Sequence, residues 1–155
     1  MPFDVTVKIN KRFKVKSPLS TVFKLLADVP ESASHFPKVK KLVDMGDNTY
    51  RWEMEKIGLD KYYIQTVYAC QYTSNKKQGT VKWEAVEDVG NALVSGKWTL
   101  KSVDPKHTQC SLTTTGVMTV PLPALTKFLL AGLVENEFQG LVDQYVENLK
   151  DVLNG

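Results

Sequence analysis

The side chains that most often carry chemistry, those of histidine and cysteine, are few in this chain and far apart. The histidines are His35 and His107, and the cysteines are Cys70 and Cys110. This set does not have the close ligand spacing of zinc sites. His107 and Cys110 are three residues apart on a predicted strand, so their side chains point to opposite faces. The sequence predicts no metal site.

The motifs of nucleophilic and cofactor-dependent enzymes are also missing from the sequence. No GxSxG elbow, phosphate-binding glycine loop or dinucleotide fingerprint occurs. His35 lies just before Phe36-Pro37, where a surface or helix-terminal role is favoured over a catalytic one. The two cysteines form neither a CxxC motif nor a disulfide framework, and buried free thiols are expected. We predict no catalytic residue and no cofactor.

Acid-base chemistry would require a polar side chain on the apolar face of a strand. Tyr68 and Tyr50 are the candidates. If the inward and outward positions of the strand are the reverse of our assignment, Gln65 or Gln71 is a further candidate. Arg51 alternates with apolar neighbours and is expected to face solvent. No two ionisable residues are predicted to be buried together, which is the usual sign of general acid-base catalysis. Catalysis is therefore the second hypothesis.

The elements that would position these residues are mostly strands. Residues 4–15 alternate apolar and polar side chains, the pattern of a half-buried strand. Between residues 38 and 120, turn signals such as Gly46-Asp47-Asn48 separate six further segments that alternate in the same way. The pattern predicts an antiparallel sheet of seven strands with one dry face and one wet face.

The dry face of this sheet combines large apolar side chains with a few hydroxyl groups. Pockets for apolar ligands have this mixture, although each aromatic residue could equally belong to an ordinary core. The residues of this face that we predict to bind ligand are Trp52, Met54, Thr66, Tyr68, Trp83, Trp98, Thr114 and Met118.

Helices are predicted at two places. After the first strand, Ser17 is expected to cap one short helix with Pro18 in its first turn, and a second short helix runs from Pro30 to Pro37. The last thirty or so residues are predicted to form one long helix. A step of about 100° per residue places Phe138 and the apolar residues after it on one stripe.

The beginning of the long helix has more apolar residues than one stripe can hold. Carried backwards, the same wheel places Phe128, Ala131 and Val134 near the stripe. The residues that lie off it are Leu125, Leu129, Leu130 and Leu133. These leucines need a second apolar neighbour. Three explanations remain open: the lining of a pocket or its portal, a homodimer or other protein interface, and a surface that touches membrane transiently during lipid exchange. Under the first, Phe128, Leu129 and Leu133 would bind ligand.

The order of the predicted elements resembles the helix-grip superfamily (SRPBCC). This superfamily includes START lipid-transfer domains, birch-pollen-allergen relatives, polyketide cyclases/dehydrases and coenzyme Q-binding proteins. The closest local matches are SPLSTVFKLLADVPESASHFPKVKKLV and VENEFQGLVDQYVENLKDVL. The resemblance implies an α+β fold, in which a seven-stranded curved antiparallel sheet wraps around a long C-terminal helix. Two short helices lie between strands 1 and 2, and a cavity remains beneath the long helix.

Composition limits the remaining options. The chain has 155 residues, 43% of them hydrophobic, which suggests one domain spanning residues 1–155. Its net charge is only +3, and Arg12 and Arg51 are the only arginines, so no nucleic-acid partner is expected. No secretory signal is visible, and the apolar run at residues 129–134 is far shorter than the ~20 residues of a membrane span. A cytoplasmic protein is expected.

These observations favour one function over two alternatives. We predict binding or transport of a hydrophobic small molecule (a lipid, a quinone or a polyketide-like compound) in an internal cavity, by a monomer or homodimer. The first alternative is a polyketide cyclase or dehydratase that uses the same cavity. The second is a protein-interaction module whose leucine-rich segment meets a partner. Solid packing beneath the long helix would exclude ligand carriage.

Overall fold

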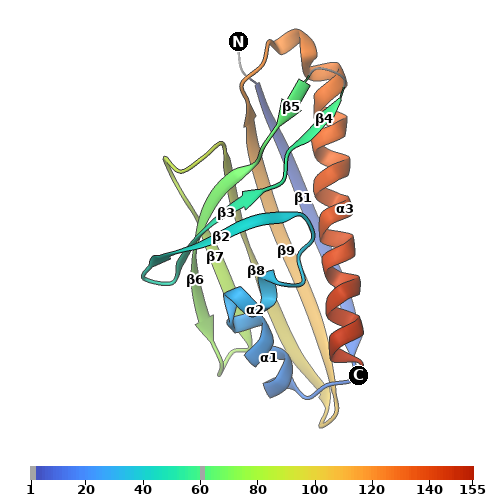
Figure 1. Cartoon of the computed structure of the whole chain (residues 1–155). Coiled ribbons are helices and arrows are strands. Elements are labelled where there is room, and N and C mark those ends of the chain that lie inside the picture. Colours follow the sequence, from blue (N-terminus) through green and yellow to red (C-terminus); the bar gives the residue numbers. More distant parts are fainter. Residues whose placement is uncertain (1–2, 60–61) are drawn as a thin grey trace.

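A curved antiparallel sheet of seven strands wraps around one long helix, α3 (Lys127–Leu153), in the computed structural model of the chain (Figure 1). The structure describes residues 3–59 and 62–155. The strand order is β1-β9-β8-β7-β6-β3-β2, and each neighbouring pair is antiparallel. The predicted helix-grip fold is confirmed.

The main sheet is built from strands that follow one another along the chain, except that β1 pairs with β9. Its strands are β1 (Phe3–Val15), β2 (Val39–Gly46), β3 (Thr49–Met54), β6 (Val67–Asn75), β7 (Thr80–Val86), β8 (Ala92–Asp104) and β9 (His107–Val120). A separate ladder pairs β4 (Ile57–Leu59) with β5 (Tyr62–Ile64). Two short helices, α1 (Leu19–Ala27) and α2 (Val29–Ala33), connect the two edge strands β1 and β2, and a 3-10 turn, η1 (Ala124–Thr126), precedes α3.

Strict alternation of buried and exposed side chains gives the sheet its dry face. In β1 the buried residues include Val5, Val7 and Ile9, and the residues between them are exposed. In β9 every second residue from Thr108 to Val120 is buried. This is the period of a strand, in which successive side chains point to opposite faces. The dry face lies against α3, so the strands and the helix share one core.

The β3–β6 hairpin differs from the expectation of two continuous strands. Glu53 pairs with Val67 in the main sheet, whereas Ile57 pairs with Ile64 at the tip, one residue out of step. A shift of one residue turns the following side chains to the opposite face. The side-chain oxygen of Asn91 accepts a hydrogen bond from the backbone N–H of Val67 at 2.9 Å, where β6 begins. The hairpin tip therefore forms its own small ladder, β4–β5.

The buried stripe of α3 drifts around the helix, which corrects the helical wheel drawn from the sequence. Leu130, Val134, Val142 and Val146 are buried, and they recur at multiples of four residues. A turn has about 3.6 residues, so each four-residue step rotates about 40° past a full turn. The wheel based on the second half of the helix was therefore right about Val134 but wrong about Phe128 and Leu130. Leu130 is 0% exposed and Phe128 is 95% exposed.

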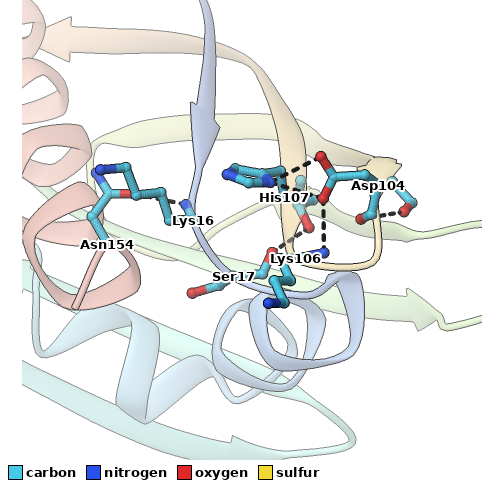
Figure 2. Close-up of polar contacts among 8 residues, drawn as sticks. Lys16, Ser17, Asp104, Lys106, His107 and Asn154 are labelled. Carbon is cyan, nitrogen blue, oxygen red and sulfur yellow. Dashed lines mark hydrogen bonds and ion pairs between the residues drawn. The ribbon is translucent and has the colours of Figure 1, made fainter.

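Polar contacts fasten the C-terminal end of α3 to the connection between β1 and α1 (Figure 2). The hydroxyl of Ser17 donates to the carbonyl of Leu153, and the backbone N–H of Lys16 donates to Oδ1 of Asn154 at 2.8 Å. The last carbonyls of a helix have no partner within it, and Ser17 satisfies one of them. Ser17 was expected to cap α1, but the N-cap is Pro18 and no side chain caps that helix.

The β8–β9 turn lies at the same end of the molecule (Figure 2). Thr108 donates to the carbonyl of Ser17 at 2.8 Å. The Asp104 carboxylate lies 2.8 Å from Nδ1 of His107 and accepts from the backbone N–H of Lys106 at 2.8 Å. These hydrogen bonds, with that of His107 the largest cause, lower the pKa of Asp104. His107 is thus part of an exposed turn.

Candidate functional site

Two adjoining cavities lie between the dry face of the sheet and the helices. The outer cavity, of about 60 Å³, is lined by residues such as Val5 of β1, Met118 of β9 and Val134 of α3. The inner cavity, of about 70 Å³, is lined by residues such as Leu26 of α1 and Trp98 of β8. Each is larger than the roughly 10–15 Å³ that one water molecule needs. The space beneath α3 is therefore not filled by side chains.

The two cavities share part of their lining. Four residues line both of them: Phe36, Tyr68, Val94 and Phe138. The ring of Phe138 lies against Gly116 of β9, where an added Cβ would be 3.3 Å from the ring. A larger residue at position 116 would push this ring away.

The sheet residues predicted to bind ligand all line one or both cavities. Met54, Thr66, Tyr68 and Met118 line the outer cavity. The inner cavity is lined by Trp52, Tyr68, Trp83, Trp98 and Thr114. The structure thus brings together eight residues from five strands, β3, β6, β7, β8 and β9, and from the β5–β6 connection. Their contact with a ligand remains a prediction.

The residues predicted from the start of α3 lie elsewhere. Phe128, Leu129 and Leu133 line neither cavity. Leu129 is 53% exposed, Phe128 is almost fully exposed, and Leu133 is partly buried against the core. The drift of the buried stripe explains this placement, because it turns Leu130 inward instead. Together with Leu125, which is 88% exposed, Phe128 and Leu129 form an apolar surface segment.

Several residues that line the cavities were not predicted as site residues, although the sequence pattern indicated some of them. Phe138 and Tyr145 lie on the predicted stripe of the long helix, but that half of the helix was expected only to seal the core. Phe36 belongs to the aromatic-proline pair after the second helix. Ser32 and Tyr72 also line the inner cavity. Nothing in the sequence pattern alone shows that α2 reaches this space.

The aromatic rings of the inner cavity support one another. Trp52 stacks on Tyr68 with ring centroids 5.8 Å apart and meets the edge of Phe36 at 5.6 Å. Tyr145 lies 5.0 Å from Phe36 and 6.1 Å from Trp98. Offset and edge-to-face pairs at these distances are favourable, so the rings hold a defined wall.

Hydrogen bonding leaves one hydroxyl of the inner cavity available among the described residues. The hydroxyl of Tyr145 is paired with Ser32, and Nε1 of Trp52 donates to the hydroxyl of Tyr72 at 3.1 Å. Tyr68 is only 7% exposed, and its hydroxyl has no hydrogen-bond partner among the residues that the structure describes. Because Tyr68 borders both cavities, its hydroxyl is the natural contact for a ligand atom.

The titratable groups of the inner cavity all hold their protons at neutral pH. Burial raises the pKa of Tyr68 and of Tyr72 well above 10.0, and it raises the pKa of Tyr145 and of Cys70 to about 12. Desolvation is the largest cause in each case, because it disfavours the charged form. These groups can donate hydrogen bonds, but none is poised as a general base.

Charged side chains border the outer cavity where it reaches solvent. Nζ of Lys38 lies 2.7 Å from Oε1 of Glu137 on α3. The backbone N–H of Glu55 donates to the carbonyl of Lys38 at 2.9 Å. The hydrogen bond and the charge of Glu137 raise the pKa of Lys38. We call Lys38, Glu55 and Glu137 the rim.

His35 lies outside both cavities. Its carbonyl accepts from the side-chain amide of Asn148 at 2.8 Å, which links the end of α2 to α3. Its Nε2 is buried and has no hydrogen-bond partner in the described part of the chain, with Glu31 at 3.7 Å. In residues 3–59 and 62–155, no group of three or more His, Cys, Asp or Glu is placed to hold a metal ion.

The match to known proteins covers almost the whole chain. Residues 6–154 match the family model described as polyketide cyclase / dehydrase and lipid transport. The chain belongs to this family. Members of the polyketide cyclase/dehydrase and lipid transport family thus share the architecture in which the two cavities occur, and the predicted superfamily is confirmed. No curated protein matches the chain significantly.

Solved structures of the same fold come from several bacteria. The Zhui aromatase/cyclase from Streptomyces sp. R1128 is 16% identical, with a TM-score of 0.62 over 97% of this chain and 92% of that one. A START superfamily protein from Mycobacterium smegmatis is 10% identical, with a TM-score of 0.67 over 94% and 96%. A conserved protein from Geobacillus kaustophilus is 16% identical, with a TM-score of 0.68 over 95% of each chain. At these identities the similarity shows the fold alone.

The longest helix, α3, does not have the character of a membrane span. Over the described residues, no helix combines the length and the apolar character needed to cross a membrane. In α3 the acidic residues Glu135, Glu137 and Asp143 interrupt the apolar sequence.

Proposed function

We propose that this protein binds and carries a hydrophobic small molecule, such as a lipid, a quinone or a polyketide-like compound, in the outer and inner cavities. One observation carries the proposal: two unfilled, mostly apolar cavities adjoin beneath α3 and share four lining residues. Cavities of this kind, with few placed polar groups, suit apolar ligands. The unpaired hydroxyl of Tyr68 supplies such a group.

A cyclase or dehydratase that uses the same cavities is the second candidate. It is favoured by the fold shared with aromatase/cyclases and by Tyr68, which could polarise a ligand carbonyl by donating a hydrogen bond. Binding without chemistry is preferred because the buried tyrosines and Cys70 remain protonated at neutral pH. General acid-base catalysis needs a group whose pKa lies near the working pH.

The three tryptophans of the chain, Trp52, Trp83 and Trp98, all line the inner cavity and report directly on its occupancy. Their fluorescence should change when a lipid or quinone enters. Native mass spectrometry of the freshly purified protein, followed by solvent extraction, should show a bound apolar compound. Empty preparations together with unchanged emission across a panel of lipids and quinones would disprove carriage.

A matched pair of variants tests whether the cavities are the site. Val94 is buried and lines both cavities, whereas Leu93 is exposed on the other face of β8. Val94→Phe should narrow both cavities and weaken ligand binding, and Leu93→Phe should leave binding unchanged. Urea unfolding of both variants shows that each is folded. Equal binding by the two variants would place the ligand elsewhere.

A further inference from the structure

We propose that the rim selects ligands by charge, so that the outer cavity takes uncharged or cationic amphiphiles and discriminates against carboxylates, with Glu55 as the discriminating residue. This inference rests on the proposed ligand-binding function and adds the class of ligand to it. It depends on three observations, concerning Lys38, Glu55 and Tyr68.

Lys38 is the one cation among the described residues that line either cavity. Its ammonium group is already engaged, because it donates to Oε1 of Glu137 at 2.7 Å. Glu137 is the more buried partner of this pair, with 23% of its side chain exposed against 53% for Lys38. A carboxylate at the rim would have to displace Glu137 and leave it without its cation. Loss of one partner from a partly buried ion pair is unfavourable.

Glu55 gives the rim an excess of negative charge. It lies next to Lys38, since its backbone N–H donates to the Lys38 carbonyl at 2.9 Å. Its charge also acts on Lys38, being one of the causes that raise the pKa of that lysine. Among the residues described, the Glu55 carboxylate forms no ion pair. With two carboxylates and one ammonium, the rim repels an anion and attracts a cation.

The interior offers an anion no compensation. The polar group available there is the hydroxyl of Tyr68, which lines both cavities and is unpaired among the described residues. A single neutral donor can satisfy an uncharged acceptor such as a ketone or hydroxyl oxygen. It cannot offset the removal of a carboxylate from water, which is far more costly than removal of a neutral group. The rim and the interior of the outer cavity thus both disfavour carboxylates.

Three probes of equal chain length test the proposal: decan-1-ol, decylamine and decanoate. At pH 7 the amine is protonated and the acid is ionised, so the probes differ in the charge of one end group. Each is titrated below its micelle concentration while tryptophan fluorescence is followed. We expect the amine to bind at least as tightly as the alcohol. We expect decanoate to bind about fivefold more weakly than the alcohol, which is the upper range for one partly exposed charge.

Glu55→Gln identifies the residue responsible, and Glu84→Gln is its control. Glu84 is exposed on β7 next to Trp83, so its side chain points away from the cavities while its removal changes the net charge equally. We expect Glu55→Gln to tighten decanoate binding about threefold and to weaken decylamine binding, without effect on the alcohol. Glu84→Gln should change none of these affinities. The charge selection is overturned if decanoate binds as tightly as the alcohol, or if the two variants behave alike. If even the alcohol fails to bind, ligand carriage itself is wrong and the selection fails with it.

Discussion

Replacing Tyr68 by phenylalanine tests whether its hydroxyl is reserved for a ligand. The side chain is almost fully buried between the two cavities, stacked on Trp52, and its hydroxyl has no partner among the described residues. Tyr145 is the matched control, because its hydroxyl is equally buried but paired with Ser32. Each substitution removes one oxygen and leaves the ring in place.

The two substitutions should change stability by different amounts. A buried polar group without a partner costs about 1–3 kcal/mol, whereas a paired one contributes about 0.5–1.5 kcal/mol net. Tyr68 borders both cavities, and its oxygen is not among the fully buried unpaired atoms of the described residues, so Tyr68→Phe should change the free energy of unfolding by less than about 1 kcal/mol. Tyr145→Phe should lower that free energy by about 1–2 kcal/mol, because it also leaves Ser32 unpaired.

Tyr68→Phe should weaken ligand binding. With decan-2-one, a probe that has a carbonyl acceptor, Tyr68→Phe should weaken binding by about 3- to 10-fold through loss of one hydrogen bond. Urea unfolding gives the stabilities and tryptophan fluorescence gives the affinities. A Tyr68→Phe protein that is destabilised as much as Tyr145→Phe, and that binds decan-2-one normally, would show that the hydroxyl serves the fold and not a ligand.

Three further predictions concern the partition, the thiols and the helix. Phe138→Ala should join the two cavities and extend the longest n-alkanol that binds, measured by tryptophan quenching along an alcohol series; an unchanged length limit would contradict the partition. Burial raises the pKa of Cys70 and of Cys110 from 9.0 to about 12, so unfolded thiols lose their protons first as the pH rises. The contribution of these two thiols to stability should be fully present below pH 9 and should be lost between pH 9 and about 12. Alanine at both positions should make the urea midpoint of unfolding less sensitive to pH in this range. In urea unfolding, Leu130→Ala should lower the free energy of unfolding by about 2–5 kcal/mol, and Phe128→Ala should leave it almost unchanged. The reverse order would support the helical wheel drawn from the sequence.

Much of the site could be predicted from local pattern because a strand alternates with a period of two. Once Trp52 and Met54 were assigned to the dry face, their direction followed, and both line a cavity. The helix was harder to predict. The buried stripe drifts around the helix along its 27 residues, so a wheel based on the second half misplaced Phe128 and Leu130.

The sequence by itself determined the order of elements, the dry and wet faces of each strand, and membership of a superfamily whose members share this architecture. The elements and the faces of the strands follow from local periodicity, whereas superfamily membership rests on resemblance to known proteins and on the family match. Only the tertiary structure decided that Phe36, Tyr68, Val94 and Phe138 divide the space beneath α3, and that Lys38 and Glu137 meet at its rim. These arrangements join side chains that are far apart in sequence, so they depend on how the sheet curves and on how the helix is rotated against it.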